Sequence, residues 1–220
     1  MIYFFSDNHY NAHPGKKIYD ALPQELKDRI SFYEDDWTVL EEGAWVENCE
    51  LLVLNMIGGS CGVPYPEHGV KHVERFVKRG GSVVLLHGSS AAFWESDWWR
   101  KLVGWRWVRP NDPDGITAST HPIEPTEVRL VAGSTHPLTK KLSSFSMPAD
   151  EVYIRLHDGS VGEVLMESTI SEGTFPQCMV VPIAEGGEIY HFLPGHTYAA
   201  QPGCVKNIVA IIEYALSNKC

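Results

Sequence analysis

The sequence lacks any apolar run that approaches the roughly 20 residues needed to span a bilayer. Its first ten residues, MIYFFSDNHY, also lack the basic region and long apolar core of a signal peptide. We therefore expect no membrane contact and a cytoplasmic location.

Positive charge is scarce as well. The chain has 18 Lys and Arg residues against 28 Asp and Glu, a net charge of −10, and its basic residues are scattered. Because phosphates need cationic partners, we expect no nucleic-acid surface. The five cysteines lie far apart and form no CxxC pair, which favours reduced thiols over a disulfide framework or a zinc knuckle.

What the sequence does contain is a clear strand-turn-helix pattern, GGSVVLLHGSSAAFWESDWWRKLVG, from Gly80 to Gly104. The apolar run Ser82–Leu86 predicts a strand that is buried on both faces. Ser89 or Ser90 is then the expected N-cap of a helix. A polar residue in the turn, His87, would lie at the carboxyl edge of a parallel sheet, where ligands bind in open α/β folds.

Similar patterns occur on both sides of this segment. Before it, we expect strands at Ile2–Phe5, Ile30–Tyr33 and Leu51–Leu54, and helices around Ile18–Leu22, around Gln24–Arg29 and after Pro66. Short spacing between these elements predicts right-handed crossovers and a parallel sheet.

After Gly104 the residues up to Pro125 are typical of a loop or an irregular hairpin. Five short strands should then add an antiparallel extension: Val128–Val131, Val152–Leu156, Val161–Glu167, Cys178–Ile183 and Glu188–Leu193. A largely buried helix is expected over Val205–Leu216. No linker interrupts the chain, so we predict a single domain over residues 1–220.

Six segments in register carry a family resemblance: GGSVVLLHGSS, DWWRKLVGWRW, His121-Pro122, THPLTKKL, Asp150-Glu151-Val152-Tyr153 and GGEIYHFLPGHT. From about Leu51 to the C-terminus, the chain resembles the ThuA-like (trehalose-utilisation) family, which has the class I glutamine amidotransferase-like fold. The resemblance implies a flavodoxin-like three-layer α/β sandwich and a role in carbohydrate metabolism.

The chain departs from true class I amidotransferases at their catalytic positions. Those enzymes carry a cysteine nucleophile in the turn after this strand and a late histidine followed by a glutamate. Here the turn holds His87, and His196 is followed by Thr197 and Tyr198. An imidazole cannot replace a thiolate in that acyl transfer, so we predict no glutaminase activity.

The predicted catalytic residues are His87, His196 and Glu151. Two imidazoles at one sheet edge can exchange protons with a sugar hydroxyl or an enediol near neutral pH, and Glu151 could orient one of them. The alternative is that each imidazole only bonds nearby backbone. A divalent metal on His87, His196 and a carboxylate is a further option, but no HxH or HExxH spacing supports it, so we assign no metal ligand.

Six more residues are predicted to bind substrate. Asp7 and His9 follow the first strand, Asp150 precedes Glu151, and His121 lies in the irregular segment. Cys61 lies in a glycine-rich turn, and Trp98 belongs to a tryptophan group whose indoles could stack on a sugar ring. For each, the alternatives are a solvated loop, a turn cap or core packing.

The favoured function is an enzyme that acts on a sugar or keto-sugar derivative by His/Glu acid-base chemistry. The alternatives are a non-catalytic carbohydrate-binding or assembly protein, or a hydrolase that uses Cys61 or Ser89. The expected partner is a small saccharide, and the sequence is compatible with a homo-oligomer.

Overall fold

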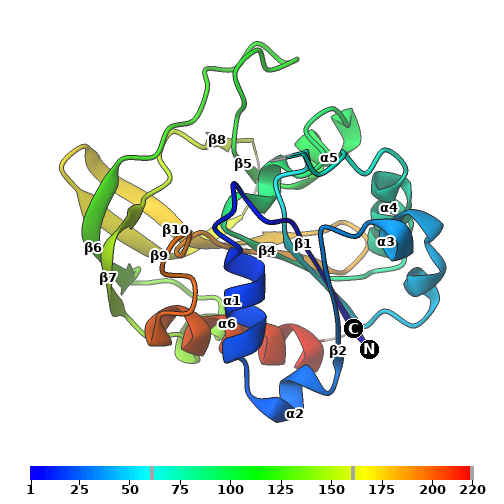
Figure 1. Ribbon diagram of the computed structural model, residues 1–220. Helices are drawn as coiled ribbons and strands as arrows, with labels where there is room; N and C mark the ends of the chain where they lie inside the picture. The colour runs from blue at the N-terminus through cyan, green and yellow to red at the C-terminus, as the bar shows by residue number, and fades with distance from the viewer. Residues whose placement is uncertain (60–61, 160–161, 219–220) are drawn as a thin grey trace.

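The computed structural model describes residues 1–59, 62–159 and 162–218. Within them, nine strands form one mixed sheet in the order β2-β1-β3-β4-β11-β10-β9-β6-β7 (Figure 1). A separate pair, β5 (Trp105–Arg106) and β8 (His157–Asp158), lies beside it. The α/β class, the mostly parallel half and the antiparallel extension are as predicted.

Five strands form the parallel half: β1 (Ile2–Ser6), β2 (Ile30–Glu34), β3 (Leu51–Asn55), β4 (Val83–Leu86) and β11 (Glu188–Phe192). In β3 every residue is buried, and its side chains alternate between the two hydrophobic clusters that flank the sheet. The aliphatic run Leu51–Leu54 therefore forms a central strand that is covered on both faces.

Four strands form the antiparallel half: β6 (Ile123–Leu130), β7 (Phe145–Glu151), β9 (Glu163–Ile170) and β10 (Gly173–Pro182). Direction reverses at each step from β11 through β10, β9 and β6 to β7. As a result, β7 points the same way as the parallel strands, and its C-terminal end lies at their carboxyl edge.

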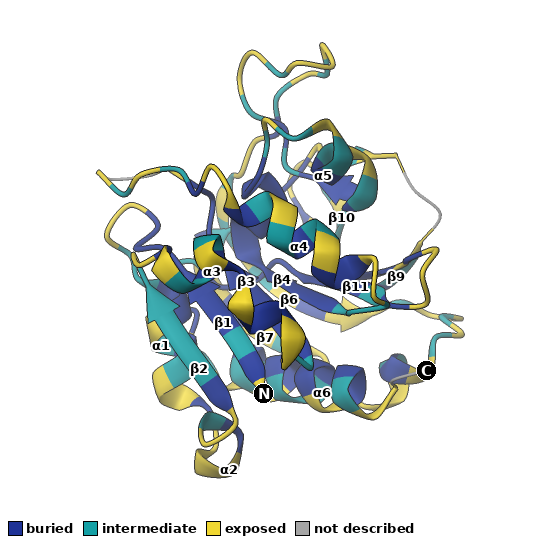
Figure 2. Ribbon diagram, turned by 90° about the vertical axis from the view of Figure 1, so that its right-hand side faces the viewer, coloured by how far each residue is buried: buried dark blue, intermediate teal, exposed yellow. Residues whose placement is uncertain are grey.

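Helices cover both faces of the sheet (Figures 1 and 2). One face carries α1 (Pro14–Ala21), α2 (Gln24–Lys27) and α6 (Pro202–Ser217), and the other carries α3 (Thr38–Glu42), α4 (Gly69–Val77) and α5 (Asp97–Leu102). Short 3-10 turns lie at η1 (Ala44–Glu47), η2 (His87–Ala91) and η3 (Pro137–Lys140). No helix in the described part of the chain is long and apolar enough to cross a membrane.

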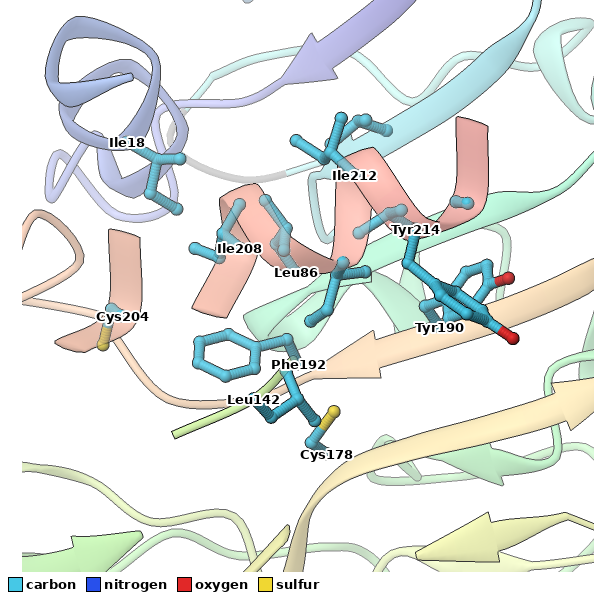
Figure 3. Close-up of a cluster of buried hydrophobic side chains, with 14 of the residues drawn as sticks. Ile18, Leu86, Leu142, Cys178, Tyr190, Phe192, Cys204, Ile208, Ile212 and Tyr214 are labelled. Atoms are coloured by element: carbon cyan, nitrogen blue, oxygen red, sulfur yellow. The ribbon is translucent and has the colours of Figure 1, made fainter. Parts of the chain in front are cut away.

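Helix α6 supplies much of the first core. Figure 3 shows Ile208 and Ile212 of this helix near Leu86 and Phe192 of the sheet, and all four side chains are buried. Burial of one such side chain contributes about 1.5–3 kcal/mol, so this layer stabilises the strands that end at the functional edge.

Two local predictions were wrong. Neither Ser89 nor Ser90 caps a helix, because η2 begins directly at His87, and α5 is capped by Ser96. The Ser89 hydroxyl instead shares its one hydrogen between the backbone carbonyls of Leu54 and Leu86 and accepts from the Met56 amide.

The strand predicted at Val152–Leu156 was also wrong, since β7 ends at Glu151. Positive φ at Arg155 breaks the run, which keeps only an isolated bridge between Ile154 and Thr120. The strand predicted at 161–167 is β9, and residue 161 lies outside the described residues.

Candidate functional site

The residues of the candidate site lie at the ends of strands, along one edge of the sheet. Asp7 and His9 follow β1, His87 follows β4 and His196 follows β11, while Glu151 ends β7. The imidazole centroids of His87 and His196 are 5.2 Å apart and nearly parallel, and the His9 centroid lies 4.9 Å and 5.0 Å from them.

The Glu151 carboxylate connects these imidazoles. Its Oε1 lies 2.8 Å from His196 Nδ1 and 3.7 Å from His121 Nδ1, and its Oε2 lies 3.3 Å from His87 Nε2. Burial alone would raise the pKa of Glu151, but the hydrogen bond from His196 and the adjacent imidazole of His87 hold that pKa well below its ordinary value. Glu151 is therefore an ionised partner for two imidazoles.

His87 is held in a defined orientation. Its Nδ1 lies 2.9 Å from the carbonyl oxygen of Leu193, so Nδ1 must carry the proton that it donates. The other nitrogen, Nε2, lies 2.9 Å from the buried Tyr153 hydroxyl. Burial raises the pKa of Tyr153 well above its ordinary value, so this hydroxyl stays protonated. It can donate to a neutral His87 and accept from a protonated one.

His196 has one free nitrogen. Its Nδ1 donates to Glu151, whereas its Nε2 is buried and has no hydrogen-bond partner among the described residues. Burial lowers the pKa of His196, but the hydrogen bond to Glu151 and its negative charge outweigh that effect and raise the pKa. The raised pKa makes His196 a stronger base, and Nε2 is the atom that can take up a proton while Nδ1 donates to Glu151.

Asp150 fixes the loop that carries His196. Its carboxylate accepts backbone N–H bonds from His196, Thr197 and Tyr198 at 3.0–3.1 Å. Asp150 thereby joins the end of β7 to the turn after β11. Asp150 is buried and is not among the residues that line the cavity. Its contacts hold the His196 loop in position.

Asp7 is buried against backbone amides, whereas His9 lines the cavity. The buried Asp7 carboxylate accepts from the backbone N–H groups of His9, Ile57 and Gly58, and burial raises its pKa to about 6. His9 lines the cavity, and burial together with the neighbouring imidazoles of His87 and His196 lowers its pKa to about 2. His9 is therefore a neutral imidazole against the site.

A cavity of about 230 Å³ opens beside these groups. Among the predicted residues, His9, His121 and Glu151 line it directly. Trp98 is not brought to the cavity, since it packs beside Trp99 on α5. Cys61 lies outside the described residues.

Four polar or aromatic residues of the cavity wall are not among the predicted site residues: Tyr10, Trp107, Arg109 and Tyr153. The Trp107 ring centroid lies 4.3 Å from that of Tyr153 and 5.6 Å from that of His121. Tyr153 belongs to the Asp150–Tyr153 segment, which was a usable signal. Trp107 and Arg109 lie in an irregular loop, whose path no periodicity reveals.

The residues present fit a divalent metal ion. Each of His87, Glu151 and His196 can offer one ligand atom, and these atoms lie within 4.8 Å of one another. The buried, unpartnered Nε2 of His196 and the backbone carbonyl that fixes the His87 tautomer are both typical of metal-ligating histidines.

The fold and site define an α/β sandwich of the class I glutamine amidotransferase-like kind, in which the turn after the central strand presents an imidazole. A model of the family described as "ThuA: Trehalose utilisation" matches residues 4–215. The chain belongs to this ThuA family, which suggests a role in carbohydrate utilisation. A search of the curated proteins finds no match.

Solved structures share the fold at low sequence identity. A ThuA-like protein from Parabacteroides merdae has a TM-score of 0.78 and 17% identity, over 99% of this chain and 90% of that chain. One from Bacteroides uniformis has a TM-score of 0.68 and 14% identity, over 99% and 91%. A cytoplasmic protein from Salmonella typhimurium has a TM-score of 0.61 and 11% identity, over 97% and 98%.

Proposed function

We propose that this protein is a cytoplasmic enzyme that acts on a sugar or keto-sugar derivative by acid-base catalysis. The observation that supports this most is the Glu151 carboxylate, which lines the cavity and contacts the imidazoles of His87 and His196, two residues that do not line the cavity themselves. Carbohydrate utilisation, suggested by the family, supplies the substrate class.

In this proposal the two imidazoles exchange protons with the substrate. His196 Nε2 takes a proton from a sugar hydroxyl, or from the carbon next to a ketone, and returns one later. Glu151 accepts from Nδ1 throughout and stabilises the imidazolium that forms. His87 acts as the second proton carrier, with Tyr153 as its hydrogen-bond partner in both protonation states.

A metal-assisted form of the same function uses His87, Glu151 and His196 as ligands. A bound divalent ion would polarise a sugar carbonyl or lower the pKa of a bound water. Neither form needs glutamine, and we expect no ammonia release from it, because the turn carries an imidazole where a thiolate would be required.

The test replaces His87 or His196 with Gln and measures turnover and affinity on a panel of 3-keto and unmodified sugars. We expect turnover to fall by roughly a hundredfold or more, while affinity stays nearly unchanged, because a positioned proton-transfer group contributes about that much. His68→Gln is the matched control, since His68 is exposed before α4.

The proposal fails if turnover survives both substitutions. If no sugar is turned over and the same substitutions only weaken affinity, by about 1 kcal/mol for each lost hydrogen bond, the protein is a carbohydrate-binding module instead.

A further inference from the structure

Arg109 lines the cavity, and its guanidinium has no carboxylate partner among the described residues. Its Nη2 donates to the backbone carbonyls of Ile57 and Gly58, and the group lies 5.4 Å from the ring centroid of Trp94. The nearby Arg100 and Arg106 do pair with carboxylates, those of Asp112 and Asp114. Unlike these two arginines, Arg109 forms no ion pair with a carboxylate of the described residues.

The peptide segment Ile57-Gly58 holds the Arg109 guanidinium in place. Ile57 and Gly58 accept from Arg109 through their carbonyls and donate their N–H groups to the buried carboxylate of Asp7. Contacts on both sides of one peptide segment therefore hold the guanidinium against the cavity. Nε and Nη1 of the guanidinium are not used by these carbonyls, and donors that are already held in position bind an anion without a further ordering cost.

Burial makes this arrangement costly without a ligand. Arg109 is half-buried, and burial lowers its pKa, which reflects the partial loss of water around a positive charge. The carbonyls of Ile57 and Gly58 and the charges of Asp7 and Glu95 oppose that loss, and an anion in the cavity would add a charge-assisted hydrogen bond to Arg109. The other charge in the cavity wall, Glu151, is already balanced by imidazoles.

The cavity sets the size of the ligand. At about 230 Å³ it is smaller than the roughly 300–1,000 Å³ of sites for drug-sized ligands, which favours a single sugar ring. Trp107 and Tyr10 add aromatic surface to the wall. We propose that the substrate is a sugar that carries an anionic group, a carboxylate or a phosphate, and that Arg109 binds this group. The inference rests on the proposed function, because it takes the cavity as the sugar site.

The test is calorimetric titration of the protein with D-glucuronate, D-glucose 6-phosphate and D-glucose. We expect at least one of the two acids to bind ten times more tightly than glucose or better. Arg109→Gln should weaken binding of that acid by roughly 10- to 100-fold and leave glucose unaffected, because charge-assisted hydrogen bonds are lost. Arg109→Lys keeps the positive charge but loses the planar guanidinium that the two carbonyls hold in place, so an intermediate loss is expected.

Arg129→Gln is the matched control, since Arg129 is exposed on β6 and lies outside the cavity wall. Preference for glucuronate identifies a carboxylate ligand, and preference for glucose 6-phosphate identifies a phosphate. The inference is overturned if neither acid binds better than glucose, or if Arg109→Gln and Arg109→Lys both bind it as tightly as the parent protein. Failure of the acid-base proposal would instead appear in the turnover of His196→Gln.

Discussion

His87 has a backbone φ of 53°, which places this non-glycine residue in the left-handed region. Such a conformation costs about 1–3 kcal/mol and persists only where the surroundings enforce it. Here Gly88 allows the tight approach, because an added Cβ would lie 2.8 Å from Ile57 Cγ2 and 3.0 Å from the Tyr153 hydroxyl. The strained turn directs the imidazole to the sheet edge.

The Tyr153 hydroxyl is the partner that lets His87 change protonation state without losing a hydrogen bond. We predict that Tyr153→Phe lowers the free energy of unfolding by about 1–2 kcal/mol, because His87 Nε2 loses a buried partner. Turnover should fall roughly tenfold with little change in KM, measured on the sugar that the panel identifies.

Tyr19→Phe is the control for this change, since Tyr19 packs on the core through its ring beside Phe32. An unfolding free energy and a turnover that match the parent protein in Tyr153→Phe would show that the hydroxyl is dispensable.

At the scale of elements, η3 is tied to β11 by one hydrogen-bonded pair. His136 Nδ1 accepts from the Leu138 amide at the start of η3, so the proton lies on Nε2, which donates to Glu188 Oε1 at 3.2 Å. The hydrogen bond from His136 outweighs the effect of burial and lowers the pKa of Glu188.

Because the folded-state pKa of Glu188 is lower than its ordinary value, its stabilisation is present above the ordinary carboxyl pKa and is lost as pH falls. We predict that Glu188→Gln lowers the free energy of unfolding by about 1 kcal/mol at pH 7, and that the difference shrinks below about pH 4. Urea unfolding at several pH values measures it. The exposed Glu185→Gln should show no such difference, and a Glu188→Gln effect that is constant with pH would contradict the prediction.

The elements themselves were predictable where burial dictates composition. Ile2–Phe5, Leu51–Leu54 and Val83–Leu86 all lie in interior strands of the sheet, and their aliphatic and aromatic runs predict this burial. Strand β7 was not predicted because Phe145–Glu151 contains Pro148 and two acidic residues, which are not typical of a central strand. These residues are tolerated here because β7 lies at the edge of the sheet. The strand was predicted instead at Val152–Leu156, the more apolar segment that follows β7.

At the scale of the whole molecule, the site is assembled from both halves of the sheet. Strand-end logic brought His87, His196 and His9 together, because parallel strands share one carboxyl edge. It could not place Arg109, Trp107 or Tyr153, whose positions depend on the path of an irregular loop and on the reversal of direction across four antiparallel strands. Their catalytic and binding roles stay predictions.

The stability of the whole protein tests whether His87, Glu151 and His196 bind a metal ion. An ion that binds only the folded state raises the free energy of unfolding. With free Zn²⁺ at 100 times Kd the gain is about 2.7 kcal/mol, and at about 2–4 °C per kcal/mol this predicts a Tm increase of roughly 5–11 °C. The measurement is thermal unfolding of EDTA-treated protein, purified without a histidine tag, before and after Zn²⁺ addition.

His196→Gln should remove the increase, because it takes away one of the three ligand atoms, whereas the exposed His68→Gln should keep it. An equal increase in the parent protein and in His196→Gln would place the ion elsewhere. No increase in the parent protein would eliminate the metal-assisted form and leave proton exchange by His87 and His196 as the chemistry of the site. The Nε2 of His196, which has no hydrogen-bond partner among the described residues, would then be the predicted proton acceptor beside Glu151 of the cavity wall.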